Sequence, residues 1–266
     1  MAYQFHEIRL EKGMYGTPGK SFTQVLESLD PSENYKGTSL EGMDAYQRQL
    51  KRFDIHVKGA GSDPVEKFFR TTESSVLFPE YVARSVRQGM EESNILPDIT
   101  AATTQIDCMD YRSIYSVPTA EEKTLKRVEP GASIPQTEVK ARENLVKLHK
   151  RGRMLVASYE AIRFQRLDLF SVMLRQIGTQ IMRMHLEDAI QVIEHGDGNN
   201  NAATAFTVGD GIIGGNAGTL DYAALLKFWN QFDPYTMNTL LVSPDAMMAL
   251  LQCAEFQNPL TGLNFQ

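Results

Sequence analysis

The sequence of 266 residues has little of what marks several common classes of protein. Its two cysteines, Cys108 and Cys253, lie far apart and form no CxxC pair, so a disulfide framework, a zinc ribbon and a thioredoxin-type site are disfavoured. We predict two buried, reduced thiols. No apolar run approaches the ~20 residues that cross a bilayer, and the first residues lack the basic-then-apolar order of a signal peptide. These absences predict an intracellular protein.

Common catalytic patterns are missing from the chain as well. It has no GxxxxGK[ST], GxSxG or HExxH motif, and its five histidines are scattered along the sequence. We therefore expect no enzymatic activity, no cofactor and no bound metal ion.

One stretch nevertheless resembles a ligand loop. It reads "IEHGDGNNNAATAF" over residues 193–206 and is followed by "GDGIIG" at 209–214. As a calcium loop it fails, because Ala202 replaces the required glycine and Val208 replaces the bidentate glutamate. As a dinucleotide turn it lacks a helix that follows directly and a preceding βαβ unit. The sequence therefore disfavours a nucleotide- or metal-dependent enzyme that uses this stretch.

The charge of the chain is unevenly distributed. The net charge of −6 argues against a nucleic-acid-binding surface over the whole sequence. Between Thr119 and Arg153, however, nine basic and five acidic side chains give a local charge of +4, which leaves −10 for the remainder. A basic segment on an acidic body can pair with an acidic neighbour, including a second copy of the chain. A solvated hairpin of mixed charge is the alternative.

Periodicity and capping residues predict helices on both sides of a β-rich middle. The first helices are too short to bury a core of their own, so they must pack on the rest of the chain or on a neighbouring subunit. Strands are predicted over residues 99–117, in the return half of a hairpin, and at "NTLLVSP", where the strand should be short and buried. The predicted helices are 22–29 after Ser21, a stretch within 40–53 after Ser39, 80–92 with Pro79 in the first turn, 159–165 after Ser158, 169–195 after Asp168, one after Thr219 or Asp221, and one that begins near Pro244.

Two of these elements have unusual lengths. The stretch from residue 117 is long, basic and β-like, and apolar and basic side chains alternate in its return, "ENLVKLHKRGRMLVASY", which is typical of an exposed two-stranded arm. A lone hairpin is marginally stable in water, so this arm needs a partner surface. The helix from Leu169 to His195 is about 40 Å long at 1.5 Å per residue, which indicates a structural spine. Gly196 suits the left-handed residue that ends such a helix.

This order of elements resembles the major capsid protein of tailed bacteriophages, which has the Hong Kong phage capsid fold. The similar stretches are "SSVLFPEYVARSVRQGMEESNIL", "RVEPGASIPQTEVKARENLVKLHKRGRMLVASYEAI", "DAIQVIEHGDGNN" and "LLVSPDAMMALLQC". The resemblance implies an α+β fold. It also implies five segments: an N-terminal arm (1–73), the helix and strand that lead into the peripheral domain (74–116), an extended hairpin loop (117–153), the peripheral domain with its spine helix (154–208) and an incomplete axial domain (209–266).

The resemblance also implies a function. Copies of the chain would form pentamers and hexamers that close into an icosahedral shell around double-stranded DNA, assembled in the cytoplasm of the bacterial host and retained in the virion. The expected partners are further copies, a separate scaffolding protein, a portal and cement proteins, with DNA held by non-specific proximity and no membrane. An encapsulin-type compartment shell is the nearest alternative. Members of the family usually continue past the axial helix, so we expect either that the native chain extends beyond Gln266 or that its end is disordered or truncated.

Two sets of residues follow from this interpretation. Basic residues of the extended loop are expected to contact acidic neighbouring subunits, and glycines around the asparagine-rich stretch are expected to form a hinge between the peripheral and axial domains. The contact residues are Lys123, Lys126, Arg127, Lys140, Arg142, Lys147, Arg151 and Arg153, and the hinge residues are Gly196, Gly198, Gly209 and Gly211.

Overall fold

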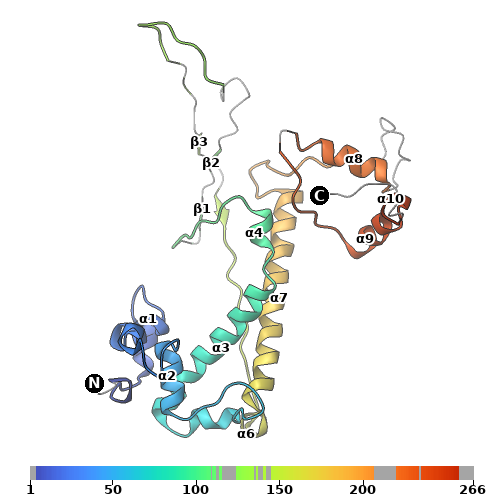
Figure 1. Ribbon diagram of the computed structural model, residues 1–266. Helices are drawn as coiled ribbons and strands as arrows, with labels where there is room; N and C mark the ends of the chain where they lie inside the picture. Colours follow the sequence, from blue (N-terminus) through green and yellow to red (C-terminus); the bar gives the residue numbers. More distant parts are fainter. Residues whose placement is uncertain are drawn as a thin grey trace. The chain divides into compact units, whose positions relative to one another are not determined.

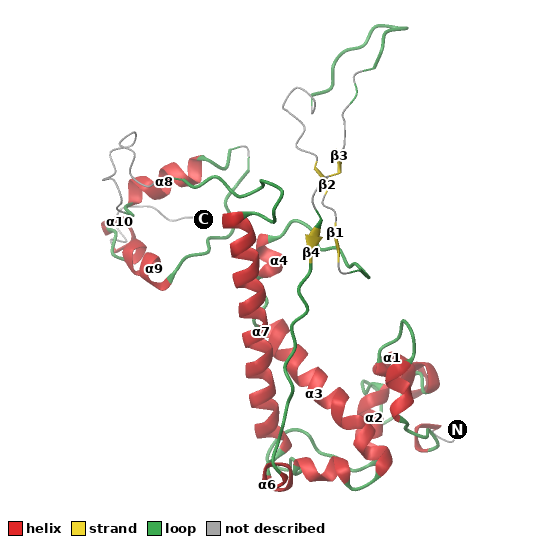
Figure 2. Cartoon of the chain, turned by 180° about the vertical axis from the view of Figure 1, so that it is seen from behind, coloured by secondary structure: helices red, strands yellow, loops and turns green. Residues whose placement is uncertain are grey.

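The computed structural model describes residues 4–108, 110–111, 114–115, 124–134, 136, 140–141, 145–206, 220–233 and 235–257. Helices predominate and the strands are short antiparallel pairs, which is compatible with an α+β fold (Figures 1 and 2). The chain divides into two compact units, one of residues 1–94 with 150–187 and one of residues 95–149 with 188–266. The first unit therefore joins the expected arm to much of the expected peripheral domain.

The first unit begins with short helices whose starts are fixed by capping side chains. Helix α1 (Phe22–Leu29) has the predicted cap, since the Ser21 hydroxyl accepts the N–H of Gln24 while the Gln24 side chain accepts the N–H of Ser21. Helix α2 (Ala45–Arg52) begins later than predicted, because Asp44 forms the same reciprocal pair with Gln47. Four 3-10 turns accompany these helices: η1 (Gln4–His6), η2 (Lys12–Gly16), η3 (Ser32–Tyr35) and η4 (Val65–Phe69).

Helix α3 (Thr72–Glu92) corrects the prediction that Pro79 lies in a first turn. The helix begins at Thr72 because Thr71 and Ser74 form a capping box there, so Pro79 lies in its interior. A proline at that position has no N–H to bond the carbonyl four residues earlier, which disfavours helix locally. Burial of Leu77 and Tyr81 on either side favours the helical geometry in spite of this loss.

Two further helices complete the first unit. Helix α6 (Tyr159–Phe164) has the predicted Ser158 cap. Helix α7 (Leu167–His195) confirms the long spine, but it begins before Asp168, which lies in its first turn and not at its cap. The Leu167 N–H instead donates to the Asp63 carbonyl, 2.9 Å away, which joins α7 to the segment before η4.

One large hydrophobic core holds most of the first unit together, and a smaller cluster is formed by Phe5, Tyr35 and Leu40. The N-terminal helices pack on the rest of their own chain, which is one of the two possibilities predicted from their length. Aromatic rings of Phe68, Phe78, Tyr81 and Phe170 lie at the centre of the large core, with centroids 5.5–6.4 Å apart in the neighbouring pairs. Its buried members are Leu10, Phe22, Leu26, Ala45, Tyr46, Leu50, Ile55, Val65, Phe68, Val76, Leu77, Tyr81, Leu167, Phe170 and Leu174.

The second unit contains helix α4 (Leu96–Ile99) and the predicted hairpin. Strand β1 (Asp110–Tyr111) pairs antiparallel with β4 (Val146–Lys147), and β2 (Ile114–Tyr115) pairs with β3 (Lys140–Ala141). The strand predicted over 99–117 is reduced among the described residues to β1 and β2, because residues 100–108 pair with no other strand there, and the first pair lies at Asp110, before the predicted hairpin at 117. Within the described ranges pairing covers two residues in each strand, and the described part of the long alternating return strand expected up to residue 157 pairs only at β4.

The same unit contains helices α8 (Tyr222–Asn230), α9 (Pro244–Leu251) and α10 (Ala254–Gln257). Asp221 caps α8 and Ser243 caps α9, with Pro244 at its first position, as the sequence predicts. The prediction of a buried strand at "NTLLVSP" is wrong. Leu240, Leu241 and Val242 are exposed, and no strand pairs with them in the part of the chain that the structure describes.

The prediction that both thiols are buried is also wrong. Both cysteines are free, but Cys108 is exposed and Cys253 is half-buried. Cys108 lies in the loop before β1, and Cys253 lies in the turn between α9 and α10, so neither belongs to the core.

Candidate assembly surfaces

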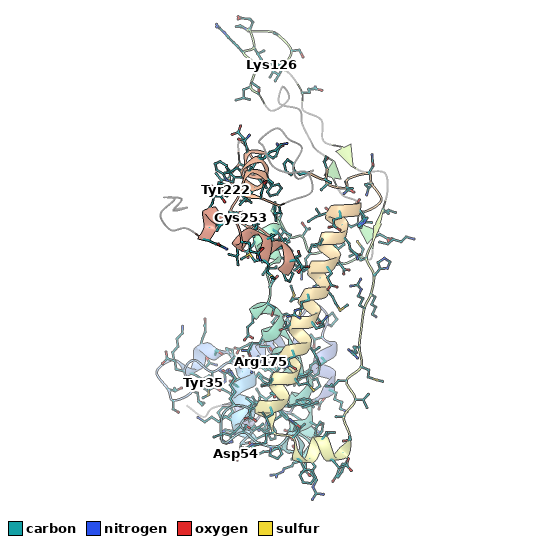
Figure 3. All side chains as sticks on the ribbon, turned by 90° about the vertical axis from the view of Figure 1, so that its right-hand side faces the viewer. Tyr35, Asp54, Lys126, Arg175, Tyr222 and Cys253 are labelled. Carbon is teal, nitrogen blue, oxygen red and sulfur yellow. The ribbon has the colours of Figure 1, made fainter. Side chains whose placement is uncertain are left out.

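The structure places the described basic residues of the hairpin on its surface. Lys126 lies towards the end of the hairpin, away from the β1–β4 pair (Figure 3). The neighbouring Arg127 side chain is 93% exposed, with its Nε 3.8 Å from a Glu129 carboxylate oxygen. An exposed pair of this kind contributes less than about 1 kcal/mol, so it leaves Arg127 available for other carboxylates.

The remaining predicted contact residues lie along the same hairpin and its return. Lys147 is in β4, while Arg151 and Arg153 follow it in an extended segment, and all three are exposed. The backbone of Lys140 pairs with Tyr115 in the β2–β3 ladder. Lys123 and Arg142 lie outside the described residues.

Apolar side chains accompany this basic segment and are just as exposed. Leu125 is 98% exposed and Met154 is 82% exposed. Large exposed apolar areas usually mark contacts with another molecule, whereas single exposed apolar residues do not. Other exposed apolar residues in this part of the chain are Val128, Ile134, Leu145, Leu148, Leu155, Val156, Tyr159, Phe164 and Leu169.

The second unit has its own exposed apolar surface around α8 and α9. Trp229 is 51% exposed, Met248 is 59% exposed and Leu251 is 55% exposed. Phe206, Phe228 and Leu250 line a small cavity of about 290 Å³ nearby, and the other described residues of its lining are apolar as well. The apolar side chains of this unit thus remain only partly covered by their own chain.

The asparagine-rich stretch is a backbone turn in the structure. Gly196 has a left-handed φ of +78° and its N–H donates to the Val192 carbonyl, as predicted for the end of α7. The Asp197 carboxylate accepts the N–H of Asn199 at 3.1 Å, and the Asn201 side chain accepts the N–H of Asp197 at 3.0 Å.

These contacts give the polar side chains of the stretch a local role. Their oxygens bind neighbouring amides, and in the described part of the chain no three His, Cys, Asp or Glu side chains gather where they could hold a metal ion. Gly198 also has a left-handed φ of +90°. The other two predicted hinge glycines, Gly209 and Gly211, lie outside the described residues, as does the "GDGIIG" motif.

Comparison with known families gives one match, over the second half of the chain. Residues 142–265, just under half of the chain, match the model of a family described as phage capsid protein. The match supports a structural protein of a bacteriophage. More narrowly, it supports a phage capsid protein, and so a component of the virion that acts structurally and not as an enzyme. Searches of curated proteins and of solved structures gave no significant match.

Within the described ranges, no helix combines the length and the apolar character that crossing a bilayer requires.

Sequence reasoning missed one polar feature of the first unit. Lys58, Arg84 and Arg175 line a common recess, although they come from a loop, from α3 and from α7. No local motif joins residues that are so far apart in sequence, so only the packing of α3 on α7 brings them together.

Proposed function

We propose that this chain is a major capsid subunit whose copies form pentamers and hexamers and close into an icosahedral shell around double-stranded phage DNA. The observation that carries the proposal is the match of residues 142–265 to the phage capsid family. The exposed apolar surfaces of the hairpin and of the α8–α9 region support it, since such surfaces favour association with other chains.

The extended loop has a specific part in this proposal. It lies over an adjacent subunit, and basic residues such as Lys126, Arg127 and Arg153 face acidic groups there. The subunit outside residues 119–153 carries a net charge of −10, so a neighbouring copy offers complementary charge. Burial of Leu125 in the same contact supplies apolar area, while the charges set the register of the contact.

Conformational change is the second part of the proposal. The turn that begins at Gly196 and Gly198 acts as a hinge between peripheral and axial domains when a precursor shell expands. Both glycines have positive φ, a region that other residues adopt only at a cost, and this supports a turn specified by the backbone. A separate scaffolding protein, a portal and cement proteins complete the expected set of partners, and assembly takes place in the host cytoplasm.

Electron microscopy of the purified protein tests the main proposal. We expect closed shells, or pentamers and hexamers, at high protein concentration. Monomers or dimers under all conditions of salt and concentration would overturn it. Double-stranded DNA in particles purified from infected cells separates a phage capsid from an encapsulin-type compartment, which would contain a cargo protein. Calorimetric titration with nucleotides and divalent cations tests the enzyme alternative, which tight binding would revive.

A further inference from the structure

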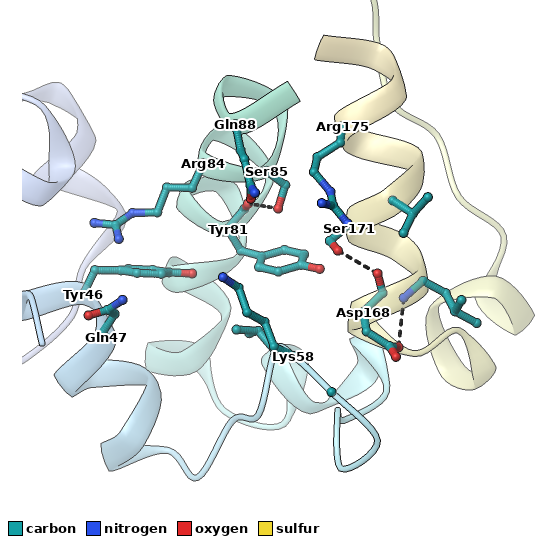
Figure 4. Close-up of a pocket in the computed structure, with 14 residues that line it drawn as sticks. Tyr46, Gln47, Lys58, Tyr81, Arg84, Ser85, Gln88, Asp168, Ser171 and Arg175 are labelled. Carbon is teal, nitrogen blue, oxygen red and sulfur yellow. Dashed lines mark hydrogen bonds between the residues drawn. The ribbon is translucent and has the colours of Figure 1, made fainter. Parts of the chain in front are cut away.

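A recess in the first unit is lined by more cationic than anionic side chains. This cationic recess has a volume of about 480 Å³ and lies among α2, the loop at residues 57–59, α3 and α7 (Figure 4). Three cationic side chains line it, namely Lys58, Arg84 and Arg175, against the single carboxylate of Asp168.

Arg84 is already neutralised within the unit. Its Nη1 lies 2.6 Å from the Asp44 carboxylate and its Nε lies 2.9 Å from the Glu80 carboxylate. Burial opposes its charged form, but these two partners outweigh burial and hold the pKa of Arg84 above its ordinary value. Its guanidinium also lies 4.3 Å from the centroid of the Tyr46 ring. Arg84 is thus a fixed wall of the recess and has no need of a ligand.

Lys58 and Arg175 are in a different position. Neither forms an ion pair within the part of the chain that the structure describes, and they approach the recess from the two sides of Tyr81 in Figure 4. Among the described residues no ion pair joins Asp168 to either of them, and its carboxylate accepts the N–H of Leu169 at 2.8 Å. Two unbalanced cations that face one cavity attract an anion, and Arg175 offers planar geometry suited to a carboxylate.

The rest of the lining indicates the size and chemistry of that anion. Val57, Leu169 and Val172 supply apolar wall, and Ser85 and Gln88 supply hydrogen-bonding groups. A cavity of this volume accommodates more than one side chain, and its apolar walls suit the methylene stem of a glutamate. The combination of cations, apolar wall and hydrogen-bonding groups matches an acidic peptide segment better than an isolated inorganic ion.

We propose that the cationic recess binds an acidic segment of a second copy of this chain, with Lys58 and Arg175 as the carboxylate-binding residues. A second copy is the favoured occupant because the chain carries −6 overall and −10 outside residues 119–153. Two copies of such an acidic chain repel one another. A cationic recess on one copy that binds an acidic segment of the other replaces this repulsion by a specific attraction. This inference rests on the proposed self-assembly.

A binding measurement tests the chemistry of the recess. Purified unassembled subunits are titrated at low ionic strength with the peptide hexaglutamate, and binding is followed by tyrosine fluorescence, since Tyr46 and Tyr81 line the recess. We expect saturable binding that weakens as salt is added. Two exposed ion pairs correspond to about a tenfold change in dissociation constant, so Lys58→Gln with Arg175→Gln should weaken binding about tenfold.

A matched control uses the same helix. Arg183 is exposed on α7 but does not line the recess, so Arg183→Gln with Lys51→Gln removes the same charge and should leave hexaglutamate binding within about twofold of the wild type. Equal weakening by both double variants would mean that net charge alone attracts the peptide, and would overturn the recess as a site. Failure of the wild type to bind hexaglutamate would overturn it as well.

Cross-linking identifies the occupant. A photoreactive phenylalanine at Gln88, an exposed residue of the lining, is irradiated in the assembled protein and the products are mapped by mass spectrometry. Cross-links to an acidic segment of another copy support the proposal. Cross-links to a different protein, or none to another copy, overturn the second-copy occupant. Shells that form normally without these cross-links would count against this inference alone, whereas hexaglutamate binding by a protein that never assembles would count against the proposed function.

Discussion

Gly89 of α3 and Gly178 of α7 meet at the point where these two helices cross. A Cβ on Gly89 would lie 2.7 Å from the carbonyl carbon of Arg175, and one on Gly178 would lie 2.9 Å from the N atom of Met90 and 3.1 Å from the carbonyl carbon of Gly89. Backbone atoms cannot move aside as a flexible side chain can. The absence of side chains at both positions therefore sets how closely α3 and α7 approach.

Alanine at this crossing should destabilise the first unit. A Gly→Ala change inside a helix ordinarily stabilises by up to about 1 kcal/mol, but here overpacking should outweigh that gain by about 1–3 kcal/mol. We expect Gly89→Ala and Gly178→Ala to lower the urea midpoint of unassembled subunits. Gly61→Ala is the control, because a Cβ there meets no atom within 4 Å. A higher midpoint for either crossing variant would show that the helices separate at little cost.

Loss of the buried Arg48 side chain should be more damaging than loss of a surface arginine. Arg48 and Asp30 are 0% and 1% exposed, and their Nε and Oδ2 atoms lie 2.6 Å apart. Arg48→Met leaves the Asp30 carboxylate buried without its cation, which should cost about 3–5 kcal/mol. Arg9→Met removes a pair with Glu11 that is mostly exposed and should cost under about 1 kcal/mol. Denaturant unfolding measures both, and equal costs would contradict the importance of burial.

Glu27 should make the first unit sensitive to acid. Burial favours its neutral form, but the N–H of Ala45 at 2.6 Å and the Ser32 N–H and hydroxyl outweigh burial and hold its pKa below the ordinary 4.5. A pKa that is lower in the folded state gives stability that is complete above 4.5 and is lost as pH falls through the folded value. We therefore expect stability to drop as the solution is acidified below that range.

Substitution of Glu27 isolates its part in this acid sensitivity. Glu27→Gln should be less stable than the wild type at neutral pH and should lose less stability on acidification. Glu33→Gln, at an exposed side chain in the same part of the chain, should keep the wild-type pH dependence. Thermal melting of unassembled subunits from pH 7 to about pH 3 gives the comparison. Identical pH slopes for Glu27→Gln and the wild type would refute the assignment.

Gly196 should control the local stability of the turn after α7. Alanine there would hold a left-handed φ of +78° and place its Cβ 2.9 Å from the Asn201 side-chain oxygen, at a cost of about 1–2 kcal/mol. The Ala203 N–H bonds to the Ile193 carbonyl at 2.7 Å across this turn, so its hydrogen exchange should become about tenfold faster. Gly152→Ala is the control, since a Cβ there meets no atom. Unchanged exchange at Ala203 would mean that the turn tolerates another residue.

Charge reversal on the hairpin should slow assembly if its basic residues contact acidic neighbours. Lys126→Glu with Arg127→Glu should lower the rate of shell formation measured by light scattering, and added salt should reduce the difference from the wild type. Lys12→Glu with Lys36→Glu changes the net charge equally at exposed positions of the first unit. Equal slowing by both pairs would attribute the effect to net charge and not to the hairpin.

Local chemistry determined much of the helical part of this protein. Ser21, Ser158 and Asp221 mark helix starts because each side chain accepts the same unsatisfied amide whatever the surroundings. Gly196 marks a helix end for an equally local reason, its tolerance of positive φ. The antiparallel hairpin was likewise predictable from alternation, although its first pair lies at Asp110.

Tertiary packing decided what local preference opposed or did not specify. Pro79 lies inside α3 because burial on either side outweighs one missing hydrogen bond, and "NTLLVSP" is not a strand because no described segment pairs with it. The crossing at Gly89 and Gly178 and the recess at Lys58 and Arg175 depend on residues far apart in sequence. Periodicity reports which face of a helix is apolar but not which helix will cover it, so these sites exist only once α3 and α7 have packed.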